Sequence, residues 1–319
     1  MSTEEGWTKE QLVERIRAKY KGEGLNPDTF MTGLLWSKPI SYWDYINLDA
    51  LLSLQVPRTI FPDEHVFIMY HQINELIFKM ILHEIEQVAE HEGLDVAFFK
   101  SRVGRIARYF DMLVSSFSIM QHGMDIDQYM RYRNSLAPAS GFQSAQYRLI
   151  ELCSTDIENL IDNRFRKDYS EDWSYEDCFD KIYWQAAGVD HKTGEKSYTL
   201  EDFESKYMDR FIETAARYED RNLYALYHKL DEEASGDEEL RQVMRHLDYT
   251  VNIKWVMAHY SAARHYLNSG NTKAQATGGS EWEKYMLPRY QKRIFFPSLW
   301  TEAEIATWGV AAEEALEGG

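Results

Sequence analysis

The sequence predicts an all-α fold made of a single large helical domain. Apolar residues recur at helical spacing along most of the chain, and strict alternation over the length of a strand is hard to find. The 319 residues include only 7 prolines, and glycine is sparse inside the long periodic segments. Hydrophobic residues make up 44% of the sequence, enough to bury a substantial core. We expect residues 1–40 to form an N-terminal arm and residues 41–319 to form the helical domain.

Start and stop signals divide the chain into successive helices. Thr8 with Gln11 forms a capping-box pattern that opens the first helix, and Thr301 with Glu304 forms another that opens a short terminal helix. The small-residue stretch 269–279 predicts a late loop. Between these signals we expect helices over residues 8–21, 41–54, 63–92, 95–120, 144–162, 171–188, 200–229 (interrupted) and 238–268.

The charge balance argues against two classes of partner. Lys and Arg number 35 and Asp and Glu number 52, which gives a net charge of −17. A surface this negative repels phosphate backbones and anionic lipids, so we expect neither nucleic-acid nor membrane partners.

The cysteines and the N-terminus indicate a cytoplasmic protein. Cys153 and Cys178 form no CxxC pattern, so we expect reduced thiols. The first seven residues are acidic and lack the apolar stretch of a signal peptide. No run approaches the roughly 18 apolar residues that a membrane span needs.

The segment 63–79 carries a histidine on the apolar side of a predicted amphipathic helix. Bulky hydrophobic residues flank His71 on this side. A buried polar group without a hydrogen bond costs roughly 1–3 kcal/mol, so this imidazole needs a partner. The partner is either a neighbouring backbone carbonyl, which is the more common case for a lone histidine, or a ligand in a cavity.

His259 lies on the predicted helix 238–268, one turn after Trp255. Among the ten histidines, none has Glu three positions earlier, as a di-iron bundle requires, and no two have the four-residue spacing of a zinc hydrolase helix. The sequence also lacks a Gly-x-Ser-x-Gly motif. Haem needs only one axial imidazole in an apolar slot between helices. His259 is therefore either a proximal haem ligand or a core histidine bonded to a carbonyl.

Arg133 stands beside aromatic residues, just before the Pro-Ala-Ser-Gly turn at 138–141. A guanidinium at a helix end presents a planar fork that suits a carboxylate. Arg133 therefore either binds the carboxylate of a ligand or forms a salt bridge within the protein.

Together these segments resemble the tryptophan 2,3-dioxygenase family, tetrameric haem enzymes that open the indole ring. Four blocks occur in the order found in that family, and PASGFQS is specific on its own. The blocks are YWDYINLDALL at 42–52, DEHVFIMYHQINELIFK at 63–79, RNSLAPASGFQS at 133–144, and WVMAH at 255–259 with TGGS at 277–280.

The resemblance implies one haem b per subunit, with O2 as co-substrate. His259 corresponds to the proximal iron ligand, and Ser140 lies near the haem edge on the distal side. Tyr42 and Tyr45 would enter the site from a neighbouring subunit of a homotetramer, a dimer of dimers.

The resemblance also implies a site for a zwitterionic indole amino acid. His71 would meet the indole N–H, with Phe67 packed on the indole and Tyr129 at the pocket wall. Arg133 would pair with the substrate carboxylate, and Thr277 would hold the α-amino and carboxylate end.

The expected activity is haem-dependent cleavage of the indole C2–C3 bond of L-tryptophan to N-formyl-L-kynurenine, a step of tryptophan catabolism in the kynurenine pathway. Two alternatives keep the helical fold: a haem hydroxylase or oxygenase acting on another aromatic amino acid or indole compound, and a non-catalytic haem-binding protein. Residues 74–77 read NELI where the family usually has YELW, and 276–282 read ATGGSEW where it has GTGGSSG. These departures leave the substrate more open than haem binding.

Overall fold

The computed structural model describes residues 6–136, 139, 143–189, 193–230, 236–268 and 287–317. It divides the chain into two compact units, Met1–Gln55 and Val56–Gly319. The first unit ends later than residue 40, where the sequence analysis placed the end of the N-terminal arm. Tyr42 and Tyr45 therefore belong to the N-terminal unit.

The N-terminal unit contains a helical pair and two single-turn helices. Helices α1 (Lys9–Gly22) and α2 (Pro27–Trp36) pack together through the stacked rings of Tyr20 and Phe30, whose centroids are 4.5 Å apart. The predicted capping box that opens α1 is present, because Gln11 N donates to the Thr8 hydroxyl and Thr8 N donates to the Gln11 side chain.

The single helix predicted over 41–54 is wrong. The segment forms two short helices, α3 (Tyr42–Tyr45) and α4 (Leu48–Leu51). Asn47 separates them with a φ of 53°, in the left-handed region that asparagine tolerates better than most residues. None of the residues in α3 or α4 is buried, so packing does not stabilise a longer helix here.

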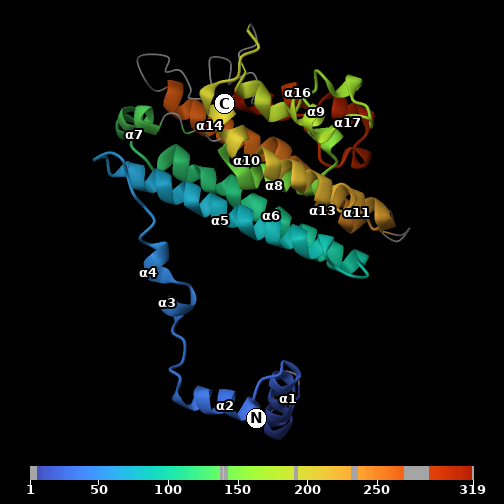
Figure 1. Ribbon diagram of the computed structural model, residues 1–319. Coiled ribbons are helices and arrows are strands. Elements are labelled where there is room, and N and C mark those ends of the chain that lie inside the picture. The colour runs from blue at the N-terminus through green and yellow to red at the C-terminus, as the bar shows by residue number, and fades with distance from the viewer. Residues whose placement is uncertain are drawn as a thin grey trace. The chain divides into compact units, whose positions relative to one another are not determined.

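The second unit is built on a pair of 27-residue helices, α5 (Asp63–Ala89) and α6 (Val96–His122), which run side by side in Figure 1. The connection between them is short, so the two helices are antiparallel. Helix α8 packs on α5, α10 packs on α8, and α13 and α14 pack on α6. These helices span Ala145–Ser154 (α8), Tyr198–Tyr218 (α10), Glu238–Tyr249 (α13) and Trp255–Asn268 (α14).

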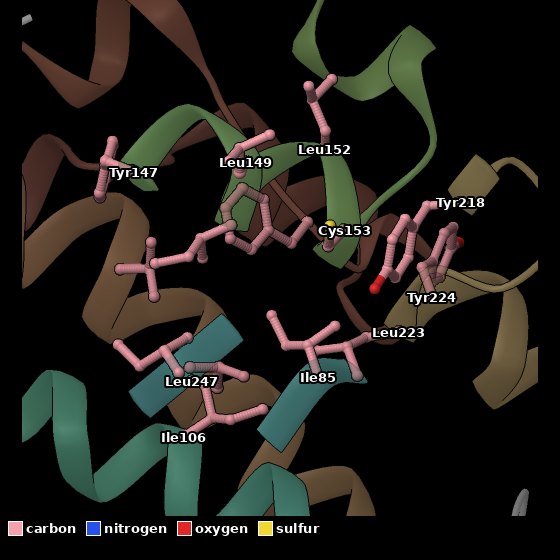
Figure 2. Close-up of a cluster of buried hydrophobic side chains, with 14 of the residues drawn as sticks. Ile85, Ile106, Tyr147, Leu149, Leu152, Cys153, Tyr218, Leu223, Tyr224 and Leu247 are labelled. Carbon is pink, nitrogen blue, oxygen red and sulfur yellow. The ribbon is translucent and has the colours of Figure 1, made fainter. Parts of the chain in front are cut away.

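The core lies where these helices meet. Figure 2 shows Ile85 from α5, Ile106 from α6, Leu149 and Cys153 from α8 and Leu247 from α13 around a common interior. Each of these side chains is buried. Cys153 and Cys178 are both free thiols, as expected. Each of these helices therefore packs its apolar face, which the periodicity predicts, into one shared core.

Two predicted helices extend too far. The helix predicted over 144–162 ends with α8 at Ser154, because Thr155 is extended and a 3₁₀ turn (Ile157–Leu160) follows. The helix predicted over 171–188 is reduced to α9 (Tyr175–Phe179) and a 3₁₀ segment (Tyr183–Ala187). An isolated β-bridge between Ile161 and Ile182 joins the extended backbone of these two regions, and no β-sheet occurs in the described ranges.

The remaining helices complete the second unit. The Thr301–Glu304 capping box opens α17, as predicted. The remaining α-helices are α7 (Ile126–Tyr132), α11 (Leu223–Lys229), α16 (Pro288–Gln291), α17 (Glu302–Ala306) and α18 (Val310–Glu317). None of the helices described here has both the length and the apolar character needed to cross a membrane.

Candidate functional site

The carboxylate of Asp63 fixes α7 against the start of α5. Asp63 Oδ2 accepts a hydrogen bond from Asp125 N at 2.6 Å, and Asp63 N donates to the Gln128 side chain at 3.3 Å. Asp125 is itself the N-cap of α7, because its side chain accepts from Gln128 N. This clamp brings Tyr129 on α7 next to Phe67 on α5, with ring centroids 6.3 Å apart.

His71 lies one turn after Phe67 on α5, and its Nδ1 is 2.7 Å from the Phe67 carbonyl oxygen. A carbonyl only accepts, so Nδ1 carries the proton and Nε2 of the neutral ring is an acceptor. Burial lowers the pKa of His71, against the raising effects of the Phe67 carbonyl and Glu75, so the neutral form is favoured. The two alternatives given above for His71, a backbone carbonyl partner and a ligand partner, are therefore compatible. Nδ1 donates to the Phe67 carbonyl, and Nε2 can accept a hydrogen bond from the N–H group of a ligand.

Arg133 begins the 3₁₀ turn Arg133–Leu136 at the end of α7 and is only 7% exposed. Its guanidinium hydrogen-bonds the Tyr129 hydroxyl and lowers the pKa of that phenol, although burial outweighs this effect and the net shift is upward. A buried cation beside a neutral hydroxyl is well suited to an anionic ligand group.

His259 projects from α14 toward the same region. Its ring stacks with Phe117 at a centroid distance of 5.8 Å, and Phe117 lies 4.7 Å from Trp255. Burial lowers the pKa of His259 to about 4, and His71 contributes to the lowering. The imidazole is therefore neutral at neutral pH, as a metal ligand must be.

The two histidines share an unusual environment. Both His71 and His259 are exposed to solvent, yet desolvation is the largest cause of their lowered pKa values. Exposed area measures contact with water, whereas desolvation reflects how densely protein atoms surround the ring. We call the region around these two rings the recess. Protonation of His71 would also lower the pKa of His259, so the two rings are close enough to interact.

The donor set of this recess fits haem. Haem iron requires one axial imidazole between apolar faces, and the neutral ring of His259 stands among Phe117 and Trp255. His71 comes from α5, and its lowered pKa makes this second imidazole neutral as well at neutral pH.

Glu75 links the second and third motif blocks. Its carboxylate accepts from the Ser144 hydroxyl at 2.6 Å and from the Gln146 amide at 2.8 Å. Ser144 is also the N-cap of α8. These bonds join α5 to the segment that leads into α8.

The structure does not place all the predicted site residues. It brings together Phe67, His71, Tyr129, Arg133 and His259. Ser140 and Thr277 lie outside the described residues. Tyr42 and Tyr45 are 70% and 74% exposed and belong to the N-terminal unit.

Three aromatic residues near the site were missed in the sequence. Phe117 stacks with the His259 ring, and no motif marks it. Tyr132 and Tyr266 pack on Tyr129, with centroid distances of 5.5 and 4.4 Å. Tyr266 follows His259 by two helical turns, so helical periodicity could have placed it on the same face.

Comparison with known proteins identifies relatives of one kind. A family model described as tryptophan 2,3-dioxygenase matches residues 33–206. The tryptophan 2,3-dioxygenase of Ruegeria sp. (strain TM1040) is 39% identical over 128 residues, which are 40% of this chain and 45% of that protein. The one from Polaromonas sp. (strain JS666) is 26% identical over 277 residues, 83% of this chain and 87% of that protein.

A vertebrate relative matches a similar share of the chain. Tryptophan 2,3-dioxygenase B of Danio rerio is 37% identical over 124 residues, 35% of this chain and 30% of that protein. With the Ruegeria and Danio proteins the chain matches less than half of the relative's length.

Proposed function

This chain belongs to the tryptophan 2,3-dioxygenase family, and from that premise we propose that it is a haem-dependent dioxygenase that cleaves the indole C2–C3 bond of L-tryptophan to N-formyl-L-kynurenine. The observation that supports this most strongly is the pair of neutral imidazoles, His71 and His259, in one desolvated recess beside the Arg133–Tyr129 pair. Haem b, one per subunit, supplies the iron that binds and activates O2.

The chain's own residues would hold the cofactor. His259 would hold the haem iron, because its lowered pKa keeps the ring neutral, as a metal ligand must be. Phe117 and Trp255 form an apolar wall behind it. The resemblance adds Ser140 near the distal haem edge.

Other residues orient the amino acid. Arg133 pairs with the substrate carboxylate, and the Tyr129 hydroxyl holds the guanidinium in place. Phe67 packs on the indole, and His71 accepts the indole N–H at Nε2, the nitrogen left as acceptor by the Phe67 carbonyl. Thr277 is proposed, on the resemblance, to hold the α-amino end. Together these contacts fix the indole double bond relative to the cofactor, a positioning contribution to catalysis.

We also propose that the active form is a homotetramer, with Tyr42 and Tyr45 entering a neighbouring subunit's site. An apolar stripe along α5 supports self-association. We call this set the α5 stripe: Met69, Ile73, Leu76 and Met80, which are 41%, 43%, 49% and 46% exposed. Their spacing of four, three and four residues places them on one face of the helix.

Haem titration of the apoprotein tests the cofactor assignment. The parent should bind one haem per chain with a histidine-ligated Soret spectrum, and His259→Ala should lose this binding while remaining folded by circular dichroism. His265→Ala, on the same helix, is the matched control and should bind haem like the parent. If His259→Ala keeps haem with an unchanged Soret band, His259 is not the ligand.

A further inference from the structure

The helix that carries His259 is interrupted by a π-helical segment. Helix α13 ends at Tyr249, the π segment spans Thr250–Lys254, and α14 begins at Trp255. An α-helix turns about 100° per residue, so one extra residue in a turn rotates everything after it by about that angle. The direction in which His259 projects therefore depends on whether this segment keeps its π register.

Asn252, in the middle of the π segment, has both ends of its side chain bonded. Its Nδ2 donates to Asp248 Oδ1 at 2.6 Å, and its Oδ1 accepts from Arg293 Nε at 2.5 Å. The side chain is 2% exposed, so water cannot replace either bond. A buried amide with both ends satisfied favours one backbone arrangement over its alternatives.

Asp248 attaches this part of the helix to the C-terminal segment. The carboxylate is fully buried and accepts from Phe295 N at 2.8 Å, Phe296 N at 3.0 Å and Trp300 Nε1 at 2.9 Å. The segment that holds Arg293 is therefore fixed to the helix at Asp248, two residues before the π segment begins.

Arg293 connects the π segment to the aromatic wall of the recess. Its Nη1 donates to Glu151 Oε1 at 2.5 Å, and its Nη2 donates to the Tyr147 hydroxyl at 2.9 Å. The Tyr147 ring lies 6.3 Å from Trp255, which packs on Phe117 beside His259. One guanidinium thus fixes the start of α14 in two ways, through the side chain of Asn252 and through Tyr147, which packs near Trp255.

We propose that Asn252 and Arg293 are positioning residues that hold the π register and so set the direction of His259 in the recess. Neither side chain is part of the recess; both act through the helix. The inference rests on the proposed function only in the experiments that use haem iron as the probe. The backbone register itself can be measured in the apoprotein.

The iron–histidine bond is the first reporter. Asn252→Ala removes both bonds of the amide, and Arg293→Lys keeps a positive charge beside Glu151 but loses the Nε that reaches Asn252. In the ferrous holoprotein both variants should shift, broaden or lose the iron–histidine stretching band in resonance Raman spectra. Haem dissociation should be faster by about 10- to 100-fold, the usual effect of losing the groups that orient a metal ligand.

A matched control separates positioning from general destabilisation. Thr155→Val removes the 2.6 Å bond from the Thr155 hydroxyl to the Phe295 carbonyl, which holds the same C-terminal segment but does not touch the π segment. This variant should lose stability yet keep the parent's iron–histidine band and haem dissociation rate. An equal change of the band in all three variants would overturn the inference.

Amide hydrogen exchange in the apoprotein is the second reporter. In the parent, the amides of residues 250–254 should exchange as slowly as those of α13, and in Arg293→Lys and Asn252→Ala the exchange should accelerate at 250–259 before it does elsewhere. Rapid exchange of 250–254 in the parent overturns the inference even if Asn252→Ala does not fold. If the parent binds no haem, the proposed function fails, while the exchange pattern still decides whether Asn252 and Arg293 hold the register.

Discussion

At the scale of single residues, the site depends on which atoms remain available once the local hydrogen bonds are made. The Phe67 carbonyl accepts the hydrogen bond from Nδ1 of His71, and the Tyr129 hydroxyl is hydrogen-bonded to the buried guanidinium of Arg133. The resemblance to the family pointed to these residues, and their one-turn spacing, Phe67 from His71 and Tyr129 from Arg133, agrees with the contacts that they make. The sequence could not predict Phe117, which approaches His259 from another helix and carries no motif.

His71→Ala should slow turnover without abolishing it, because the proposed hydrogen bond from the indole N–H to His71 would contribute on the order of 1 kcal/mol to binding. The substrate 1-methyltryptophan lacks the N–H, and its methyl group clashes with His71 in the parent. The ratio of turnover on 1-methyltryptophan to turnover on tryptophan should therefore rise in the variant. A ratio that does not move would place His71 away from the indole nitrogen.

The affinity for L-tryptophan should not fall as the pH passes 6.5, the ordinary pKa of histidine. Burial lowers the pKa of His71, and protonation removes the acceptor at Nε2. Affinity is therefore present above the lowered pKa and is lost only as the pH falls through it. Calorimetric titrations of the parent and His71→Ala over this range measure the effect. A loss centred on pH 6.5 in the parent alone would show that His71 is not desolvated.

Arg133→Lys should weaken tryptophan binding strongly, because one ammonium cannot reproduce a two-point fork. Loss of a charge-assisted pair costs roughly 1.5–3 kcal/mol, about 10- to 150-fold in affinity. Tryptamine lacks the carboxylate, so it should bind the parent poorly and distinguish little between the two proteins. If the substitution weakened both ligands equally, Arg133 would have a structural role only.

At the scale of elements, the long helices could be predicted and the short ones could not. Helices α5 and α6 repeat an apolar face over many turns. The helical periodicity is therefore clear even where a single polar residue, such as His71, interrupts the apolar face. In the segment 41–54, the left-handed backbone conformation of Asn47 interrupts the helix. The spacing of apolar residues does not predict this conformation. The π segment was equally hidden inside the predicted helix 238–268, because Asn252 within it bonds Arg293, a residue far along the chain that helical spacing does not reveal.

At the scale of the whole molecule, the α5 stripe leaves large side chains in contact with water. A monomer rarely exposes a continuous apolar face of this kind. The N-terminal unit likewise exposes Trp36, Tyr42 and Tyr45. Apolar surface on both units fits a protein that completes its fold by association with further copies. The sequence suggested this assembly only through its resemblance to the family.

Ile73→Lys combined with Met80→Lys should shift the parent oligomer to smaller species, because two charges would be buried in the proposed interface. Sedimentation velocity measures the shift. Asp209→Lys, an exposed position on α10, is the control and should leave the oligomer intact. If the double variant sediments like the parent, the α5 stripe is not an interface.

The reaction itself is tested most directly with isotopically labelled O2. The haem-loaded protein is reduced without oxygen, mixed with L-tryptophan, exposed to labelled O2, and its product is analysed by mass spectrometry. The expected product is N-formylkynurenine that carries both oxygen atoms of a single O2 molecule. A product with one labelled oxygen atom would identify a hydroxylase, and unchanged tryptophan in a haem-loaded protein would identify a haem-binding protein without this activity. Either result would contradict the proposed dioxygenase.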